Sequence, residues 1–332
     1  MIGSLAFLAL AAAAAHAPKS IALPGAPATG VGMDFIAYDQ AHGRVWVPAG
    51  NTGSVDVIAT ATGKLTRIEG FATKEVERNG TKRTIGPSSA IVGDGVVYVG
   101  NRGDSSICAL DAASLEKGPC VVLDSMPDAL AVVKATKELW VTTPRNNSIV
   151  VLDTSQPDAL TVKQTFTTPG APECFVVDET RGIVYTNLED KNRTVAIDVK
   201  TRTVTKTWMP DCSEDGPKGL ALDESANLLF VACPERVRLL DAGHDGKILA
   251  TVEVGEGVDA IDYVQGRHEL FAAAGRAGKL VVARLDPKGT LTTVATITTA
   301  PSARNAVATE KGVAYLTDAH DGTILVVEPN HH

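Results

Sequence analysis

Basic residues are scarce in this 332-residue chain, in which 31 lysines and arginines stand against 39 aspartates and glutamates and give a net charge of −8. Contacts with phosphates need clustered Lys and Arg, and the sequence contains no such tract, so the composition argues against a nucleic-acid partner. The unbroken apolar run over residues 5–15 is too short to cross a bilayer. We therefore expect neither a nucleic-acid-binding protein nor a membrane span.

The chain also lacks the short motifs that mark several enzyme classes. It contains no H-E-x-x-H, C-x-x-C, G-x-S-x-G or Walker A pattern. Gly30-Val31-Gly32 lacks the third glycine and the following helix of a dinucleotide fingerprint. No nucleotide cofactor is therefore expected.

The first residues have the pattern of an export signal. The apolar run ends in Ala15-His16-Ala17, an A-x-A cleavage pattern, although no Lys or Arg precedes the run. The pattern predicts a signal peptide over residues 1–17 and hence a periplasmic or secreted protein. A buried apolar helix is the alternative interpretation of the same run.

Five cysteines are in keeping with an oxidising compartment. If Asp111 faces Lys117 across a short turn, Cys108 faces Cys120 directly, at a distance that suits a disulfide. We predict this bridge. At most one more bridge can form among the other three cysteines, and a buried free thiol is expected for the one left over: Cys174, Cys212 and Cys233.

The dominant feature of the sequence is a repeat. Residues 217–241 read PKGLALDESANLLFVACPERVRLLD, which is three short apolar segments joined by polar turns and therefore typical of β-strands. Similar units recur at a spacing of roughly 40 to 54 residues, and most third strands end near an Asp that can bond its own backbone. These aspartates are Asp111, Asp153, Asp198, Asp241 and Asp286. Seven copies of four strands predict an all-β, seven-bladed β-propeller.

The two ends of the chain are expected to close this ring. The seventh copy lacks a fourth strand, because residues 323–328 run directly into the C-terminus. Residues 20–23 have a strand pattern and no partner within the first copy. They would complete the last blade and remove an open sheet edge. We therefore expect one domain over residues 18–330.

Three segments at the end of second strands are similar to the YVTN motif: Tyr98-Val99-Gly100-Asn101, Tyr185-Thr186-Asn187 and Tyr315-Leu316-Thr317-Asp318. Residues 216–223, GPKGLALD, are similar to the G-P-x-G-[LIV]-A-[LIV] segment that precedes that motif. On these motifs the chain resembles the exported YVTN-repeat seven-bladed propellers, the gluconolactonase-like group. The resemblance implies the fold more strongly than a function, because propellers host binding modules and several kinds of enzyme.

The predicted fold places a ring of polar residues at one mouth of the central channel. First strands line the channel, and the start of a first strand lies on the same face as the turn after the second strand. The starts carry Asp34, Ser88, Asp128, Glu173, Lys218, Asp259 and Arg304, and the turns add Asn101, Arg102, Asn187, Asp318 and His320. We expect a small-molecule site at this mouth. Its predicted substrate-binding residues are Asn101, Arg102, Asp128, Lys218, Arg304 and His320.

Two interpretations of the ring remain open. In the first, ion pairs between blades seal the channel, since Lys218 lies between Glu173 and Asp259, and Arg304 lies between Asp259 and Asp34. In the second, oxygen ligands hold a divalent cation such as Ca²⁺, Mg²⁺ or Mn²⁺. The predicted ligands are Asp34, Glu173, Asn187 and Asp259.

The cation interpretation leads to an enzyme. Gluconolactonase-type propellers hold a divalent cation at this mouth with Glu, Asn and Asp, so the resemblance implies a lactone or ester hydrolase with Asp259 and Glu173 as its catalytic carboxylates. The usual Glu of the first blade is absent, and Asp34 stands at the comparable position. The alternative function is a non-enzymatic propeller that binds a ligand or a protein partner on this face.

An insertion interrupts the repeat between the first two copies. Residues 71–85 contain Asn79-Gly80 between two polar strand patterns, which predicts a β-hairpin. The insertion joins a fourth strand to a first strand and so lies at the charged mouth. A functional lid and a solvated excursion are both compatible with it.

Overall fold

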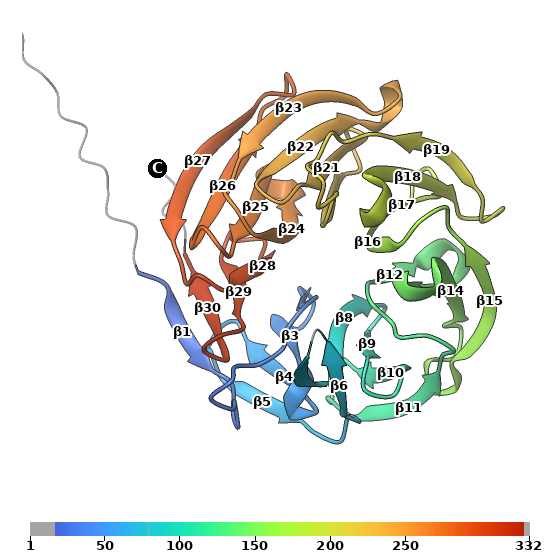
Figure 1. Cartoon of the computed structure of the whole chain (residues 1–332), viewed down its shortest axis with the longest axis vertical. Coiled ribbons are helices and arrows are strands. Elements are labelled where there is room, and N and C mark those ends of the chain that lie inside the picture. The colour runs from blue at the N-terminus through green and yellow to red at the C-terminus, as the bar shows by residue number, and fades with distance from the viewer. Residues whose placement is uncertain (1–16, 79, 329–332) are drawn as a thin grey trace, which may run out of the picture.

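The computed structural model describes residues 17–78 and 80–328, so the predicted signal peptide lies almost entirely outside the described residues. Seven four-stranded antiparallel sheets stand in a ring around a central channel (Figure 1). The predicted all-β, seven-bladed β-propeller is therefore confirmed. The predicted domain limits, residues 18 and 330, stay predictions, and residue 330 is not among those described.

Blades 1 to 6 pair their strands in sequence order, from the channel outwards. Blades 1 to 3 contain β2 (Ala37–Asp39), β3 (Arg44–Ala49), β4 (Ser54–Ala59) and β5 (Leu65–Ile68); β8 (Pro87–Gly93), β9 (Val96–Asn101), β10 (Ser106–Asp111) and β11 (Lys117–Val122); and β12 (Leu130–Val133), β13 (Glu138–Thr143), β14 (Ser148–Asp153) and β15 (Thr161–Thr167).

Blades 4 to 6 follow the same order. They contain β16 (Pro172–Asp178), β17 (Ile183–Leu188), β18 (Arg193–Asp198) and β19 (Val204–Trp208); β20 (Leu220–Asp223), β21 (Leu228–Ala232), β22 (Arg236–Asp241) and β23 (Lys247–Glu253); and β24 (Val258–Val264), β25 (Glu269–Ala274), β26 (Lys279–Leu285) and β27 (Leu291–Thr298).

Blade 7 combines both ends of the chain. Its strands are β28 (Ala303–Ala308), β29 (Ala314–Asp318), β30 (Thr323–Val327) and β1 (Lys19–Ala22). Short 3-10 helices occupy some of the turns: η1 (Gly50–Thr52), η2 (Lys134–Thr136), η3 (Pro144–Asn146), η4 (Pro157–Ala159), η5 (Glu189–Lys191), η6 (Ala242–His244) and η7 (Gln265–Arg267). Within the described residues, no helix is long and apolar enough to cross a membrane.

The blades are held together by seven apolar clusters, each of which lies between two neighbouring blades. Every second strand contributes one buried aromatic side chain at the same place in the repeat, and each cluster contains one of them. Because second strands are covered on both faces by adjacent blades, they read as continuous apolar runs rather than as alternating ones. The aromatic residues are Trp46, Tyr98, Trp140, Tyr185, Phe230, Phe271 and Tyr315.

The predicted ring closure is confirmed. All four residues of β1 pair antiparallel with β30, in a register that sets Ser20 opposite Leu325 and Ile21 opposite Ile324. Beyond the strand, the Leu23 amide donates to the carbonyl of Gly322 at 3.0 Å, and its side chain is buried. The N-terminal segment therefore supplies the outer strand that the last blade lacks (Figure 1).

The first strand of blade 1 begins later than the sequence predicts. The sequence places Asp34 at the start of this strand, whereas β2 begins at Ala37. The preceding residues instead reach the neighbouring blade, where the Phe35 amide donates to Ser88 at 3.1 Å and the Ala90 amide donates to Phe35 at 3.0 Å. A contact between blades thus replaces pairing within the blade at the charged mouth.

The aspartates at the ends of third strands behave as predicted. In each of the five, Oδ1 accepts backbone N–H groups from residues that follow in the turn, as with Asp198 and the amides of Lys200 and Thr201 at 3.0 and 2.7 Å. The others are Asp111, Asp153, Asp241 and Asp286. These bonds satisfy backbone N–H groups of the turn, so that the strand ends there.

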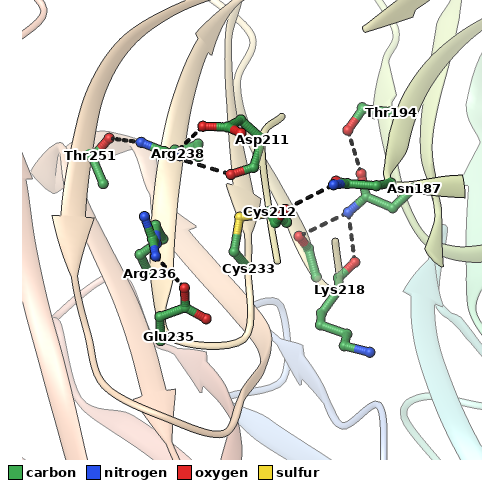
Figure 2. Close-up of a disulfide and its surroundings, with 12 residues drawn as sticks. Asn187, Thr194, Asp211, Cys212, Lys218, Cys233, Glu235, Arg236, Arg238 and Thr251 are labelled. Atoms are coloured by element: carbon green, nitrogen blue, oxygen red, sulfur yellow. Dashed lines mark hydrogen bonds and ion pairs between the residues drawn. A yellow bond between two sulfur atoms is a disulfide. The ribbon is translucent and has the colours of Figure 1, made fainter. Parts of the chain in front are cut away.

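The predicted disulfide between Cys108 and Cys120 is confirmed, and the two residues are direct partners in the ladder. The expected pairing of Asp111 with Lys117 is wrong, because a bulge sets Leu110 opposite Lys117 and restores the register at the cysteines. The second bridge joins Cys212 to Cys233 (Figure 2). The remaining cysteine, Cys174, is a free buried thiol, as expected. Two disulfides are compatible with an extracellular protein.

Candidate functional site

A chain of ion pairs crosses the predicted mouth. Arg102, in the turn after β9, bonds Asp34 at 3.0 Å and also Asp128. Arg304, near the N-terminal end of β28, bonds Asp259 at 2.8 Å, and its guanidinium group lies 3.8 Å from the carboxylate of Asp34. The alternating series Asp128, Arg102, Asp34, Arg304 and Asp259 therefore links five blades. The expected position of Arg304 between Asp259 and Asp34 is confirmed.

Glu173 lies among these carboxylates and forms no ion pair with any of the residues that the structure describes. Burial, reinforced by the negative charges of Asp128, Glu189, Asp34 and Asp259, raises its pKa from 4.5 to about 9. A hydrogen bond joins the carboxyl groups of Glu173 and Asp128. Burial also raises the pKa of Asp128, but Arg102 acts in the opposite direction, so we assign the shared proton to Glu173, which donates to Asp128.

The carboxyl group of Asp259 has a different environment. Burial raises its pKa to about 6, while Arg304 acts in the opposite direction. At neutral pH Asp259 is therefore ionised, whereas Glu173 stays protonated. Two neighbouring carboxyl groups whose pKa values are pushed apart are a common arrangement for an acid and a base.

Lys218 does not pair as the sequence suggested. It was expected between Glu173 and Asp259, but its ammonium group bonds Glu189 of η5. Sequence reasoning missed Glu189, although it follows a second strand and so obeys the rule that placed other residues at this mouth. The segment before Lys218 is anchored by the bridge between Cys212 and Cys233, which fixes its path into the mouth (Figure 2).

Asn187 and Asn101 hold the backbone rather than face a ligand. The amide of Asn187 donates to the Lys218 carbonyl at 2.7 Å, and its Oδ1 accepts the hydroxyl of Thr194 at 2.7 Å (Figure 2). Asn101 donates to the Ala72 carbonyl at 3.1 Å and accepts from the amide of Gly103. Both side chains are buried, so neither is free to contact a substrate or a cation.

His320 is solvated rather than part of the site. Its side chain is 85% exposed and bonds the neighbouring Asp321 at 2.7 Å. Asp318, from the same turn, is buried and accepts the hydroxyl of Ser302. The structure therefore brings together Asp34, Arg102, Asp128, Glu173, Asp259 and Arg304, and leaves out Asn101, Asn187 and His320.

The predicted ligand set does not fit a divalent cation. The Oδ1 of Asn187 is taken by Thr194, and Asp34 and Asp259 face guanidinium groups. Within residues 17–78 and 80–328, no group of three or more His, Cys, Asp or Glu side chains is arranged to hold a metal ion. The arrangement matches the ion-pair interpretation of the ring better than the cation interpretation.

The inserted hairpin covers part of this mouth, as its position in the sequence predicted. It consists of β6 (Lys74–Arg78) and β7 (Thr81–Ile85), paired in a register that sets Arg78 opposite Thr81. The C-terminal end of β7 and the first residues of blades 1 and 2 together line a cavity of ≈ 150 Å³. The polar side chains of that wall are Asp34, Arg83, Thr84, Ser88, Arg102 and Arg304.

Two features of the cavity wall point to a ligand. Arg83 is exposed on β7 and forms no ion pair with any residue that the structure describes. The Ser88 hydroxyl is buried and has no hydrogen-bond partner within the described chain. Three guanidinium groups therefore line one small cavity, and that of Arg83 has no carboxylate partner among the described residues.

Comparison with known proteins shows the fold and no more. No family model and no curated protein matches the sequence. A chain of a mitotic checkpoint complex matches 99% of this chain over 100% of its own length, with 15% identity and a TM-score of 0.75. A streptogramin B lyase matches 94% of this chain and 97% of its own, with 14% identity and a TM-score of 0.71. A virginiamycin B lyase from Staphylococcus aureus matches 94% of this chain and 99% of its own, with 13% identity and a TM-score of 0.71. Membership of the YVTN-repeat group stays a prediction.

Proposed function

We propose that this propeller binds a small molecule bearing one carboxylate, in the cavity between the charged mouth and the β6–β7 hairpin. The observation that carries the proposal is the convergence of Arg83, Arg102 and Arg304 on that cavity. A guanidinium group presents a planar fork of donors that matches a carboxylate. Of the three, Arg83 has no anion in the described protein to satisfy it.

The charge balance sets the class of ligand. Arg83, Arg102 and Arg304 carry three positive charges, and Asp34, Asp128 and Asp259 carry three negative ones, so the site is neutral before a ligand enters. One added negative charge can be shared by the three guanidinium groups, whereas a doubly charged phosphate would face the ring carboxylates. A cavity near 150 Å³ holds a molecule of about six non-hydrogen atoms.

A titration of small monocarboxylates such as lactate, with inorganic phosphate in parallel, tests this proposal. In metal-free buffer at low salt, we expect one carboxylate per chain and weaker binding of phosphate. The variant Arg83→Gln should bind about tenfold more weakly, because it loses a charge-assisted bidentate bond. Lys82→Gln is the matched control, since Lys82 lies on the same strand, pairs with Glu75 and is not in the cavity wall. Equal affinities for the wild type and Arg83→Gln would refute the proposal.

The displaced pKa values of Glu173 and Asp259 support a second candidate, the opening of a small lactone or ester without a metal. Glu173 holds a proton that it can donate to a leaving oxygen, and Asp259 is an ionised base near neutral pH. The net reaction would consume one water, whose hydroxyl enters the new carboxylic acid. Its other proton, taken by Asp259, replaces the one that Glu173 gives to the released alcohol, and the carboxylic acid then loses its proton to solvent. The sequence analysis predicted these same two carboxylates as the catalytic residues.

Turnover of a panel of small lactones and esters separates the two candidates. If the mouth is catalytic, Glu173→Gln should lose at least 100-fold in kcat, because an amide cannot donate an acidic proton. Carboxylate binding should persist in that variant, since Glu173 does not line the cavity. Carboxylate binding with no turnover of any compound leaves the protein as a binding propeller.

A further inference from the structure

The opposite mouth of the channel is lined at its centre by aliphatic side chains of the first strands. Two adjoining cavities of ≈ 390 and ≈ 620 Å³ open there, and they share Ile91, Val92, Asp262, Tyr263 and Gln265 as wall residues. A third cavity of ≈ 180 Å³ extends into the channel. The residues common to all three are Ile91 and Asp262. Volumes of 300 to 1,000 Å³ are typical of small-molecule sites.

Asp262 breaks the pattern of the repeat. It stands three residues after Asp259, the blade-6 member of the charged ring. At the same offset the other six blades carry apolar residues, namely Ala37, Ile91, Ala131, Val176, Ala221 and Val307. A single carboxyl group in an otherwise apolar ring violates the local rule, and such violations occur mainly at functional sites.

Asp262 has no cationic partner among residues 17–78 and 80–328. One carboxylate oxygen accepts the amide of Tyr263 at 2.8 Å, and the other accepts the amide of Ala308 at 2.7 Å. Among the described residues it forms no ion pair, and burial raises its pKa. Each oxygen keeps a second lone pair for another donor. A positively charged donor would therefore stabilise the ionised carboxylate.

The surrounding charges also favour a cation. The titratable side chains that line the two outer cavities include four acids, Glu179, Glu224, Asp262 and Glu310, and one base, Lys134. Between them lie partly exposed aliphatic side chains of the first strands, among them Val132, Val176 and Leu222. The surface is thus apolar at its centre and negative at its rim.

We propose that this opposite mouth, the apolar funnel around Ile91 and Asp262, binds an organic amine with an apolar body, its ammonium group on Asp262. The apolar body would displace water from the aliphatic wall, which provides affinity. The ammonium group would supply the counter-charge that the protein lacks, which provides selectivity for amines over alcohols and acids. The site is separate from the carboxylate cavity and does not depend on it.

Calorimetric titration with octylamine, octanol and octanoate, all below their aggregation limits, tests this proposal. We expect octylammonium to bind at least tenfold more tightly than octanol. Octanoate should have no affinity for the funnel in the Arg83→Gln variant, which has lost the main anchor of the other mouth. Octylammonium binding should be unchanged in that variant. Equal affinities for octylamine and octanol, or no binding of either, would overturn the proposal.

Two variants assign the ammonium group to its partner. Asp262→Asn should reduce octylammonium affinity to that of octanol and leave octanol unaffected. Because this amide disturbs one of the two backbone bonds, Ile91→Lys provides a second measurement. The ammonium group of the new lysine would enter the funnel and compete for Asp262. Octylammonium should therefore bind to this variant at least about tenfold more weakly than to the wild type. Wild-type affinity for octylammonium in either folded variant would contradict the assignment.

Discussion

Removal of residues 18–25 is expected to destabilise the whole ring, although the segment lies at the edge of the molecule. The deletion takes away β1, which pairs with β30 along its full length, and the buried side chain of Leu23. Loss of about four strand hydrogen bonds and one buried leucine costs roughly 4 to 6 kcal/mol. It also exposes an unpaired edge on β30, which favours aggregation.

Thermal unfolding of the truncated chain, followed by light scattering, measures both effects. The matched control replaces the β6–β7 hairpin with a short turn, because that deletion removes more residues but no blade strand. The control should unfold at nearly the wild-type temperature. If the hairpin lies over an occupied cavity, the control should also release a bound carboxylate faster. A truncated chain with the melting temperature of the wild type would refute the closure mechanism.

The stability of the protein is expected to fall with rising pH because of Glu173. Its pKa is about 9 in the folded protein against 4.5 for the free side chain, so the folded state holds a proton that the unfolded state has released between these values. Stability falls with pH wherever the folded state binds more protons. The contribution is fully present below pH 4.5 and is lost as the pH rises to about 9. At about 1.4 kcal/mol per pKa unit, the loss between pH 5 and pH 9 amounts to about 5 kcal/mol.

Glu173→Gln should remove this dependence. The amide of the glutamine can donate to Asp128 as the protonated Glu173 does, but it cannot ionise. Denaturant unfolding at pH 5, 7 and 9 should show the variant close to the wild type at pH 5 and more stable than it at pH 9. Glu116→Gln, at an exposed turn, is the control. Parallel pH profiles for all three proteins would show that Glu173 ionises normally.

Much of the fold could be predicted because the same sequence pattern occurs in seven copies. The aromatic residue of each second strand and the aspartate that ends most third strands recur at fixed offsets, so each copy supports the interpretation of the others. The partnerless strand at the N-terminus followed from the same count. The late start of β2 was missed, because Phe35 pairs with the neighbouring blade, and contacts between blades leave no periodic signal in the sequence.

The site was predictable in position but not in pairing. The repeat offset placed Asp34, Asp128 and Asp259 at the mouth and predicted the partners of Arg304, yet it gave Lys218 the wrong partner. Lys218 reaches Glu189 instead of Glu173, because the turn after β17 brings Glu189 to it. The offset also could not distinguish a side chain that faces the mouth from one, such as Asn187, that bonds the adjacent backbone. These outcomes depend on loop geometry, which a single sequence specifies weakly.

A crystal structure of the wild-type protein grown with lactate in metal-free buffer tests the proposed function most directly. The proposal predicts one carboxylate in the cavity under the β6–β7 hairpin, bonded to Arg83 and to Arg102 or Arg304, with Glu173 within hydrogen-bond distance of Asp128. The same crystals soaked with Ca²⁺, Mg²⁺ or Mn²⁺ should show no ion in the ring. An empty cavity, or a cation held by Asp34, Glu173 and Asp259, would contradict it.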